Sequence, residues 1–219
     1  MSKLKLNLDQ FEAVIFDMDG TMVDNTKFHE KSVVQFLQAR GIKLGAGEFK
    51  KRFFGKKNDA ALKDIFGDKF SKQEISNLAD EREALYRKMY APFIKEVQGL
   101  TELIKKIKAK GLKVAIATTA PKVNRKFVLD ALNLHGNFEV IIGEEHVKKG
   151  KPDPEIYLKA AKALKVDPKD SLVFEDSRVG VKAAKNAGMT VVALLTTHKK
   201  EELKEADFEV EHFEQVEII

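Results

Sequence analysis

Acidic residues crowd the segment VIFDMDGTMVD, residues 14–24, directly after an apolar run. Asp17 and Asp19 lie two positions apart, at the point where the apolar run ends. Two carboxylates this close repel each other unless a cation lies between them. Carboxylate oxygens are hard ligands that suit Mg²⁺, an ion that keeps bound waters and takes a substrate oxygen. We therefore predict a magnesium ion at this segment, whereas Asp24 is expected to support the loop.

Short apolar runs rich in β-formers recur along the chain, at residues 13–16, 113–118, 139–143, 171–176 and 190–195. Because these runs are continuously apolar, they predict central strands of a parallel sheet covered on both faces. Helical patterns lie between several of them, at residues 100–110, 153–164 and 178–187. Asp153 is expected as the N-cap of the second pattern, with Pro154 as its first helical residue. Strand alternating with helix predicts an α/β fold with a doubly wound, Rossmann-like sheet.

One interval breaks this alternation. Roughly 95 residues separate Asp17 from the strand that begins near Lys113, whereas a βα crossover needs only ~30. Residues 24–91 contain no convincing strand but several helical patterns, one of them opened by a capping box at Ser71 and Glu74. We predict an all-helical cap domain at 24–91, inserted after the first strand into a core domain made of residues 1–23 and 92–219. Such an insertion is expected over the carboxyl ends of the strands, where doubly wound folds bind ligands.

Further polar residues fall at or just after predicted strand ends. Thr118 ends the second strand, and Glu175 and Asp176 end the fourth. Lys151 follows the third strand by a short loop. Each residue alone has an ordinary explanation as a turn, a strand end, a helix cap or a surface charge. Their shared position in a parallel sheet favours a single site that also includes the acidic loop.

These residue types suit phosphoryl transfer. A carboxylate that faces a metal-bound phosphate can attack phosphorus and form an aspartyl phosphate. The transferring group carries negative charge, so catalysis is mainly positioning and neutralisation. Mg²⁺, the ammonium of Lys151, the hydroxyl of Thr118 and loop amides can supply that neutralisation. Asp19 can protonate the leaving alcohol and then deprotonate the attacking water.

Four segments, DMDGTMVD, AIATTA, GKPDPEIY and VFEDSRVGVKAAKNAGM, resemble in order and spacing the four motifs of the haloacid dehalogenase-like hydrolase superfamily. The helical insertion resembles the type 1 cap of β-phosphoglucomutase-like phosphatases. The resemblance implies Asp17 as nucleophile and Asp19 as general acid and base. It also implies Thr118 as the phosphate-binding hydroxyl and Lys151 as the neutralising lysine. The Mg²⁺ ligands that it implies are Asp17, the backbone carbonyl of Asp19, Glu175 and Asp176.

The cap is expected to set specificity. The segment DNTKFH, which contains Asn25 and His29, resembles the stretch that occupies the start of the cap in relatives. The segment GKKND, residues 55–59, resembles the cap loop that touches substrate. The β-phosphoglucomutases carry Ser-Arg where this chain has Lys57-Asn58, which weakens the mutase interpretation. The residues that we expect to contact substrate are Gly20, Asn25, His29, Lys57, Thr119 and Lys122.

The sequence therefore predicts a Mg²⁺-dependent phosphatase that hydrolyses a small phosphorylated metabolite, a sugar or polyol phosphate. The alternative within the superfamily is a β-phosphoglucomutase, which passes the phosphoryl group to a sugar instead of water. A non-catalytic binding module on the same fold is disfavoured because all the catalytic positions are present. A two-component receiver domain is disfavoured because it has no helical insertion after its first strand.

Composition excludes several other classes. The 219 residues include no cysteine, which excludes disulfides, thiolate catalysis and cysteine-ligated zinc. The first residues lack the apolar stretch of a signal peptide, and no apolar run approaches the ~18 residues of a membrane span. The net charge is +5, but basic residues are interleaved with glutamates, as on solvated helix faces. We expect a cytoplasmic monomer with neither nucleic acid nor membrane as a partner.

Overall fold

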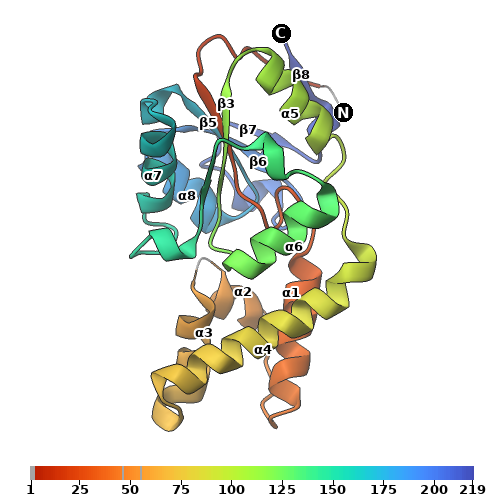
Figure 1. Cartoon of the computed structure of the whole chain (residues 1–219), viewed down its shortest axis with the longest axis vertical. Coiled ribbons are helices and arrows are strands. Elements are labelled where there is room, and N and C mark those ends of the chain that lie inside the picture. Colours follow the sequence, from red (N-terminus) through yellow and green to blue (C-terminus); the bar gives the residue numbers. More distant parts are fainter. Residues whose placement is uncertain (1–2, 46, 55) are drawn as a thin grey trace. The chain divides into compact units, whose positions relative to one another are not determined.

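The computed structural model describes residues 3–45, 47–54 and 56–219 (Figure 1). The chain divides into two compact units. The core unit comprises Met1–Asp24 and Lys95–Ile219, and the cap unit comprises Asn25–Ile94. The sequence places the boundaries after residues 23 and 91, and the structure has them after Asp24 and Ile94.

Among the described residues, a six-stranded sheet runs through the core unit in the order β4-β3-β2-β5-β6-β7. All of its strand pairs are parallel. Its strands are β2 (Ala13–Phe16), β3 (Lys113–Ala117), β4 (Val140–Ile142), β5 (Ser171–Glu175), β6 (Thr190–Leu194) and β7 (Phe208–Val210). Strand order reverses at the β2–β5 pair, the type of position where doubly wound folds bind ligands. The predicted α/β fold and the five predicted strands are confirmed.

The sequence missed the shortest strands. These are β7 and the pair β1 (Leu4–Leu6) and β8 (Val216–Ile218), which form a separate parallel sheet. Each has three residues, too few for an alternating or continuous apolar pattern to register. Short 3₁₀ helices also lie in the connections, at Gly67–Lys69, Ala91–Phe93, His135–Asn137, Glu144–His146, Pro168–Asp170, Lys200–Glu202 and Phe213–Gln215.

Helices cover the sheet of the core unit. They are α5 (Leu100–Ala109), α6 (Lys122–Leu132), α7 (Glu155–Leu164) and α8 (Arg178–Asn186). Ile15 belongs to a buried cluster with residues of α7 and α8. The next residue, Phe16, points to the opposite face, where its ring stacks on Phe174 at 5.1 Å between centroids and meets Phe213. Strand β2 is thus buried on both faces, which explains why its sequence is apolar throughout.

The ends of two core helices show how these helices are capped. Helix α5 ends at Ala109, and Gly111 beyond it has φ +80°, the left-handed conformation expected of a C′ glycine. The start of α7 differs by one residue from the prediction. The helix begins at Glu155, Pro154 holds the cap position, and Asp153 Oδ1 accepts the Glu155 amide at 3.0 Å. Asp153 therefore still accepts a hydrogen bond from an amide at the start of the helix, although it precedes the cap residue and does not hold the cap position itself.

The cap unit is helical, and its described residues contain no strand. Its helices are α1 (Thr26–Gln38), α2 (Glu48–Phe53), α3 (Asn58–Phe66) and α4 (Lys72–Tyr90). The predicted capping box opens α4, since the Glu74 amide donates to Ser71 Oγ and the Ser71 amide donates to Glu74 Oε2. Aromatic residues such as Phe36, Phe49 and Phe66 fill the centre of this unit. Across the part of the chain that the structure describes, no helix combines the length and apolar surface that a bilayer crossing needs.

Candidate active site

Chemistry-bearing side chains gather where the central strands of the core unit end. Asp17 follows β2 directly, and its amide donates to the carbonyl of Phe174 in β5 at 3.0 Å. Glu175 is the last residue of β5, and Asp176 follows it. Lys151 reaches the same place from the connection between β4 and α7. The parallel register therefore unites residues that are distant in the sequence, as the positions of the motifs predict.

Lys151 is the centre of this group. Its Nζ lies 2.6 Å from Asp17 Oδ1 and 2.6 Å from Glu175 Oε1. It also donates to the hydroxyl of Tyr157 at 3.1 Å, and that hydroxyl donates to Glu175 Oε1 at 2.9 Å. The side chain of Lys151 is only 4% exposed. The cation that contacts Asp17 in this structure is thus an ammonium, in a place where the sequence alone suggests a metal ion.

Burial controls the ionisation of this group. Desolvation raises the pKa of Asp17 to about 8, because Lys151 offsets only part of it and the Glu175 charge adds to it. Desolvation and the charges of Glu175 and Asp17 raise the pKa of Asp176 well above its usual range. Burial opposes ionisation of Glu175 and Lys151 too. Their attraction nevertheless lowers the pKa of the glutamate and raises the pKa of the lysine. Ionisation of all three carboxyls would therefore leave more buried negative charge than the Lys151 ammonium balances.

Asp176 has its own set of hydroxyl partners. Thr21 Oγ1 lies 3.3 Å from Asp176 Oδ1, and the Thr197 hydroxyl also hydrogen-bonds this carboxylate. The backbone carbonyl of Asp176 lies 3.1 Å from His198 Nδ1. Gly20 has φ +82°, and a Cβ at that position would lie 2.0 Å from Asp176 Oδ2. Gly20 thus brings the first loop against Asp176, where any larger residue would collide.

The remaining predicted core residues lie in neighbouring loops. The amide of Thr118 donates to the Ile142 carbonyl at 3.0 Å, and Thr118 Oγ1 accepts the Ala120 amide at 3.1 Å. Thr118 is buried, whereas Thr119 and Asp19 are half-buried. Lys122 is exposed at the first residue of α6.

Sequence reasoning missed some residues that contact the site. Tyr157 lies in the helix predicted at 153–164 and is not among the predicted site residues, yet its hydroxyl bonds both Lys151 and Glu175. Thr196, Thr197 and His198 follow strand β6, and Thr196 Oγ1 donates to the Gly20 carbonyl. The rule that selects polar residues after strand ends selects Thr118 and applies equally to this segment. That rule does not select Tyr157, because its hydroxyl belongs to a residue inside a helix and not to one after a strand end.

The acidic residues fit a hard divalent cation. The oxygens of Asp17, Asp19 and Asp176 are the type of donor that Mg²⁺ prefers, and the excess buried negative charge favours a cation. Both oxygens of Glu175 already accept hydrogen bonds, Oε1 from Lys151 and Oε2 from the Asp176 amide. Within the described residues, no three His, Cys, Asp or Glu side chains are already grouped as a metal site. The donor chemistry is thus suitable, while the arrangement shown has the lysine between two of the carboxylates.

The predicted cap contacts lie among other cap residues. Asn25 Nδ2 donates to the Tyr86 hydroxyl at 2.7 Å, and the His29 ring stacks on Tyr86 at 3.7 Å between centroids. His29 Nδ1 is also 3.1 Å from Arg82 Nη1. Lys57 is half-buried and caps the start of α3. In the predicted substrate loop 55–59, Gly55 lies outside the described residues.

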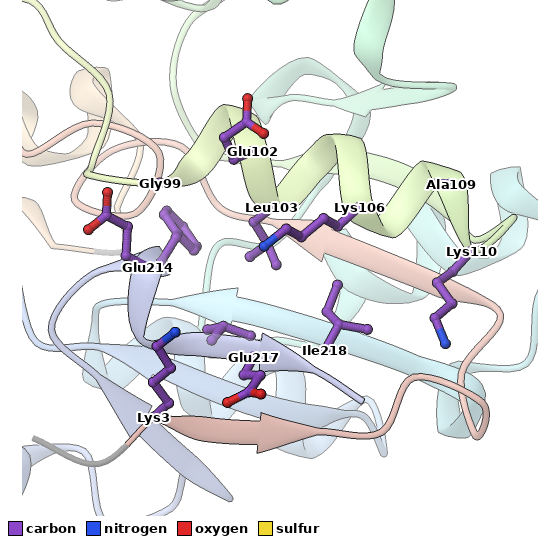
Figure 2. A pocket seen from close by; sticks show the side chains of 12 residues that line it. Lys3, Gly99, Glu102, Leu103, Lys106, Ala109, Lys110, Glu214, Glu217 and Ile218 are labelled. Carbon is purple, nitrogen blue, oxygen red and sulfur yellow. The ribbon is translucent and has the colours of Figure 1, made fainter.

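A pocket of about 740 Å³ lies elsewhere in the core unit, between α5 and β8 (Figure 2). Lysine and glutamate side chains surround an apolar floor there. The residues that line it are Lys3, Gly99, Glu102, Leu103, Lys106, Ala109, Lys110, Phe213, Glu214, Val216, Glu217 and Ile218. This lining includes none of the predicted site residues, so we assign the chemistry to the strand ends.

Comparison with known proteins identifies the family of this chain. Residues 14–194 match the family described as haloacid dehalogenase-like hydrolase, and this match spans most of the chain. The chain belongs to the haloacid dehalogenase-like hydrolase family. It is therefore an enzyme of the hydrolase class, and the resemblance seen in the four motifs is confirmed.

Curated relatives of this hydrolase include phosphatases. It is 33% identical over 178 residues to the phosphorylated carbohydrates phosphatase of Thermotoga maritima, covering 81% of this chain and 82% of the relative. It is 36% identical over 192 residues to (DL)-glycerol-3-phosphatase 2 of Arabidopsis thaliana, covering 82% and 77%. Among solved structures, the β-phosphoglucomutase of Clostridium difficile matches with a TM-score of 0.84, at 26% identity, over 94% of this chain and 93% of that one.

Proposed function

We propose that this hydrolase is a Mg²⁺-dependent phosphatase that acts on a small phosphorylated metabolite, a sugar or polyol phosphate. The observation that carries the proposal is the buried Asp17 carboxylate, held 2.6 Å from the Lys151 ammonium at the end of the central strand. Desolvation and nearby negative charge oppose its ionisation, so binding of a further cation would favour the ionised carboxylate. The names of the two curated phosphatases support the same reaction class.

The residues of the core unit divide the reaction between them. An Asp17 oxygen attacks phosphorus, the bond to the leaving alcohol breaks, and an aspartyl phosphate forms. Asp19 gives its proton to the leaving oxygen and then takes one from water, which attacks the aspartyl phosphate and regenerates Asp17. Lys151 orients Asp17 and neutralises charge on the phosphoryl oxygens. Thr118, Gly20 and Thr119 donate hydrogen bonds to those oxygens through a hydroxyl and loop amides.

The acidic residues are proposed to hold the cofactor. The donors are Asp17, the backbone carbonyl of Asp19, Glu175 and Asp176. When bound, Mg²⁺ supplies positive charge that favours ionised Asp17 and offsets the charge of the substrate phosphate. The hydroxyls of Thr21 and Thr197 orient Asp176 for this role.

Specificity is proposed to come from residues that approach the rest of the substrate. Asn25, His29 and Lys57 of the cap unit and Lys122 of the core unit take this role. Lys57 and Lys122 carry positive charge and suit a substrate with a second anionic group. We also propose that the enzyme acts as a cytoplasmic monomer, which size-exclusion chromatography and localisation of a tagged protein can test.

The second candidate function is that of a β-phosphoglucomutase. It is favoured by one observation, the structural match to the Clostridium difficile enzyme of that name. The two functions separate in one assay, in which β-glucose 1-phosphate is supplied with a trace of the bisphosphate. Release of free phosphate supports the phosphatase. Formation of glucose 6-phosphate without net phosphate release assigns the mutase instead.

Hydrolysis of a generic aryl phosphate tests the proposal most simply. We expect phosphate release with Mg²⁺, little release after chelation, and none above background in Asp17→Asn. Hydrolysis that persists in Asp17→Asn contradicts the assigned nucleophile. A complete lack of hydrolysis across a panel of phosphate esters contradicts the proposed phosphatase function. The same panel, ranked by kcat/KM, names the substrate class.

A further inference from the structure

One buried arginine next to the site has no part in the mechanism above. Arg125 lies in the first turns of α6 and is 5% exposed. Both of its Nη atoms donate hydrogen bonds, and such bonds are the usual requirement for burying an arginine. Its contacts lead directly to the loop that carries Thr118.

The guanidinium of Arg125 joins two loops of the core unit. Its Nη1 donates to the backbone carbonyl of Ala120 at 2.7 Å. Both Nη atoms also donate to the Glu145 carboxylate, which lies in the 3₁₀ turn after β4. The arginine thus ties the loop after β3 to the loop after β4 through a planar, two-pronged contact that a lysine cannot reproduce.

Ala120 passes this constraint to the phosphate-binding hydroxyl. While its carbonyl accepts from Arg125, its amide donates to Thr118 Oγ1 at 3.1 Å. A hydroxyl has one hydrogen to donate and two lone pairs that accept. Because Oγ1 already accepts the Ala120 amide, the hydroxyl can aim its own hydrogen at a phosphate oxygen. The orientation of Thr118 therefore depends on where Ala120 is held.

Gly143 makes room for the arginine. A Cβ on Gly143 would lie 1.9 Å from Arg125 Nη1. The backbone of Gly143 has φ −114°, which any residue adopts, so conformation does not explain the glycine. The glycine is explained by space, because the Arg125 guanidinium occupies the volume that a Cβ would need. The sequence therefore provides the arginine in α6, and both its carboxylate and its clearance in the turn after β4.

We propose that Arg125 is a positioning residue for phosphate binding, which acts by fixing the Thr118–Ala120 loop. Glu145 aligns the guanidinium, and Gly143 admits it. The inference rests on the proposed phosphatase function, because it takes Thr118 as a phosphate ligand. It goes beyond that function by placing the source of the loop's geometry in α6 and in the turn after β4.

The central test compares Arg125→Met with Lys126→Met. Lys126 is the adjacent basic residue of α6, is 71% exposed in its side chain, and pairs with Asp130 at 2.6 Å, away from the loop. We expect the inhibition constant of inorganic phosphate to rise about 10- to 100-fold in Arg125→Met, the scale of a misplaced binding group. We expect less than a twofold change in Lys126→Met. An unchanged inhibition constant in Arg125→Met overturns the proposal, even if the variant is less stable.

Milder variants keep the test decisive if Arg125→Met does not fold. Arg125→Lys retains the charge but reaches only one acceptor, so its inhibition constant is expected between those of wild type and Arg125→Met. Gly143→Ala pushes the guanidinium from its place and is expected to weaken phosphate binding in the same direction. Wild-type inhibition constants in both Arg125→Lys and Gly143→Ala contradict the proposal.

A double variant shows whether Arg125 acts through Thr118. Thr118→Val removes the hydroxyl with little change of shape, and a second loss from Arg125→Met should then be small. Non-additive effects on the phosphate inhibition constant support the proposal, whereas effects that multiply refute it.

Phosphate binding can also be followed without turnover. With Mg²⁺ present, inorganic phosphate should raise the Tm of wild type and of Lys126→Met more than that of Arg125→Met. An equal rise in all three proteins overturns the role of Arg125. A wild type that binds phosphate but hydrolyses no ester refutes the proposed phosphatase function and leaves the positioning role supported. The two failures are therefore distinguishable.

Discussion

The core unit and the cap unit each contain a polar cluster around a buried ion pair, and the two clusters differ in how their charges balance. The core cluster consists of Asp17, Lys151, Glu175 and Asp176. It contains three carboxylates and one ammonium. The cap cluster consists of His29, Asn58, Arg82 and Glu83, in which the guanidinium of Arg82 donates to both Asn58 and Glu83. It contains one guanidinium, one carboxylate, one imidazole and one carboxamide.

This difference separates a reactive cluster from a structural one. Both clusters hold nearly inaccessible ion pairs, so burial alone does not distinguish them. In the core cluster, desolvation and repulsion raise the pKa of Asp17 and of Asp176, which makes the folded state less stable at high pH. A folded protein keeps such an excess of buried negative charge where its chemistry requires it, and a bound cation neutralises that charge. Excess charge of one sign is therefore the better marker of function.

The largest effect should follow removal of the nucleophile. Asp17→Asn should lower kcat by at least about 10⁴-fold, the scale of losses when a nucleophile is removed. Asp24→Asn is the matched control, because Asp24 is an exposed acid at the end of the same segment. It should keep a kcat within about twofold of wild type, since surface substitutions have small effects. Steady-state kinetics on an aryl phosphate decide the outcome, and equal losses in both variants would remove the distinction between the two aspartates.

Matched removal of a cation from each cluster sharpens the comparison directly. Lys151→Met and Arg82→Met should each destabilise the fold by about 3–5 kcal/mol, because each leaves a buried carboxylate without its partner. Only Lys151→Met should also lower kcat, by about 10²–10³-fold, since it removes charge stabilisation from the reaction. Urea unfolding and kinetics on the folded protein measure the two effects. A comparable loss of kcat in folded Arg82→Met would place the cap cluster in the chemistry as well.

The charge imbalance predicts how stability depends on pH. Asp17 has a folded pKa of about 8 in place of 3.8, so the folded state holds a proton that the unfolded state releases. Its contribution to stability is complete below pH about 4 and is lost as pH rises towards about 8. Without metal, the unfolding free energy should fall over this interval more steeply in wild type than in Asp17→Asn, by on the order of a few kcal/mol.

Glu175 has a lowered pKa because Lys151 offsets its burial, so it acts in the opposite direction and reduces the fall in both proteins. Denaturant titrations at several pH values measure the two slopes. Added Mg²⁺ should stabilise wild type most at the high end of the interval, because it binds the ionised carboxylates. Parallel slopes for the two proteins would show that Asp17 ionises normally in the folded state.

The smallest effect should come from Tyr157→Phe. This change removes one hydroxyl that bonds Lys151 and Glu175 and leaves the packing of the ring intact. Loss of such a bond typically destabilises by about 0.5–1.5 kcal/mol, and we expect a loss in kcat of less than about tenfold. Thermal unfolding and kcat measure it. A loss as large as that of Lys151→Met would mean that the hydroxyl itself takes part in the reaction.

The same comparison shows what the sequence can predict. The core strands and their terminal residues are readable because β2 is apolar throughout and ends in Asp17. Lys151 joins Asp17 only through a connection whose path depends on tertiary packing, so its position between Asp17 and Glu175 could not be predicted. No sequence motif indicates Arg125, because its position depends on the space that Gly143 leaves for the guanidinium. Candidate site residues at strand ends can thus be predicted from the local sequence. The contacts that hold them in place join residues far apart in the sequence and cannot.

The most direct measurement is a search for a phosphorylated aspartate during turnover. Wild-type enzyme, Mg²⁺ and a good substrate are mixed, quenched in acid within the first turnovers, and digested for mass spectrometry. The account predicts one phosphoryl group on the peptide that contains Asp17, and none on the same peptide of Asp17→Asn. Rapid hydrolysis with no phosphorylated peptide, together with retained activity in Asp17→Asn, would contradict it.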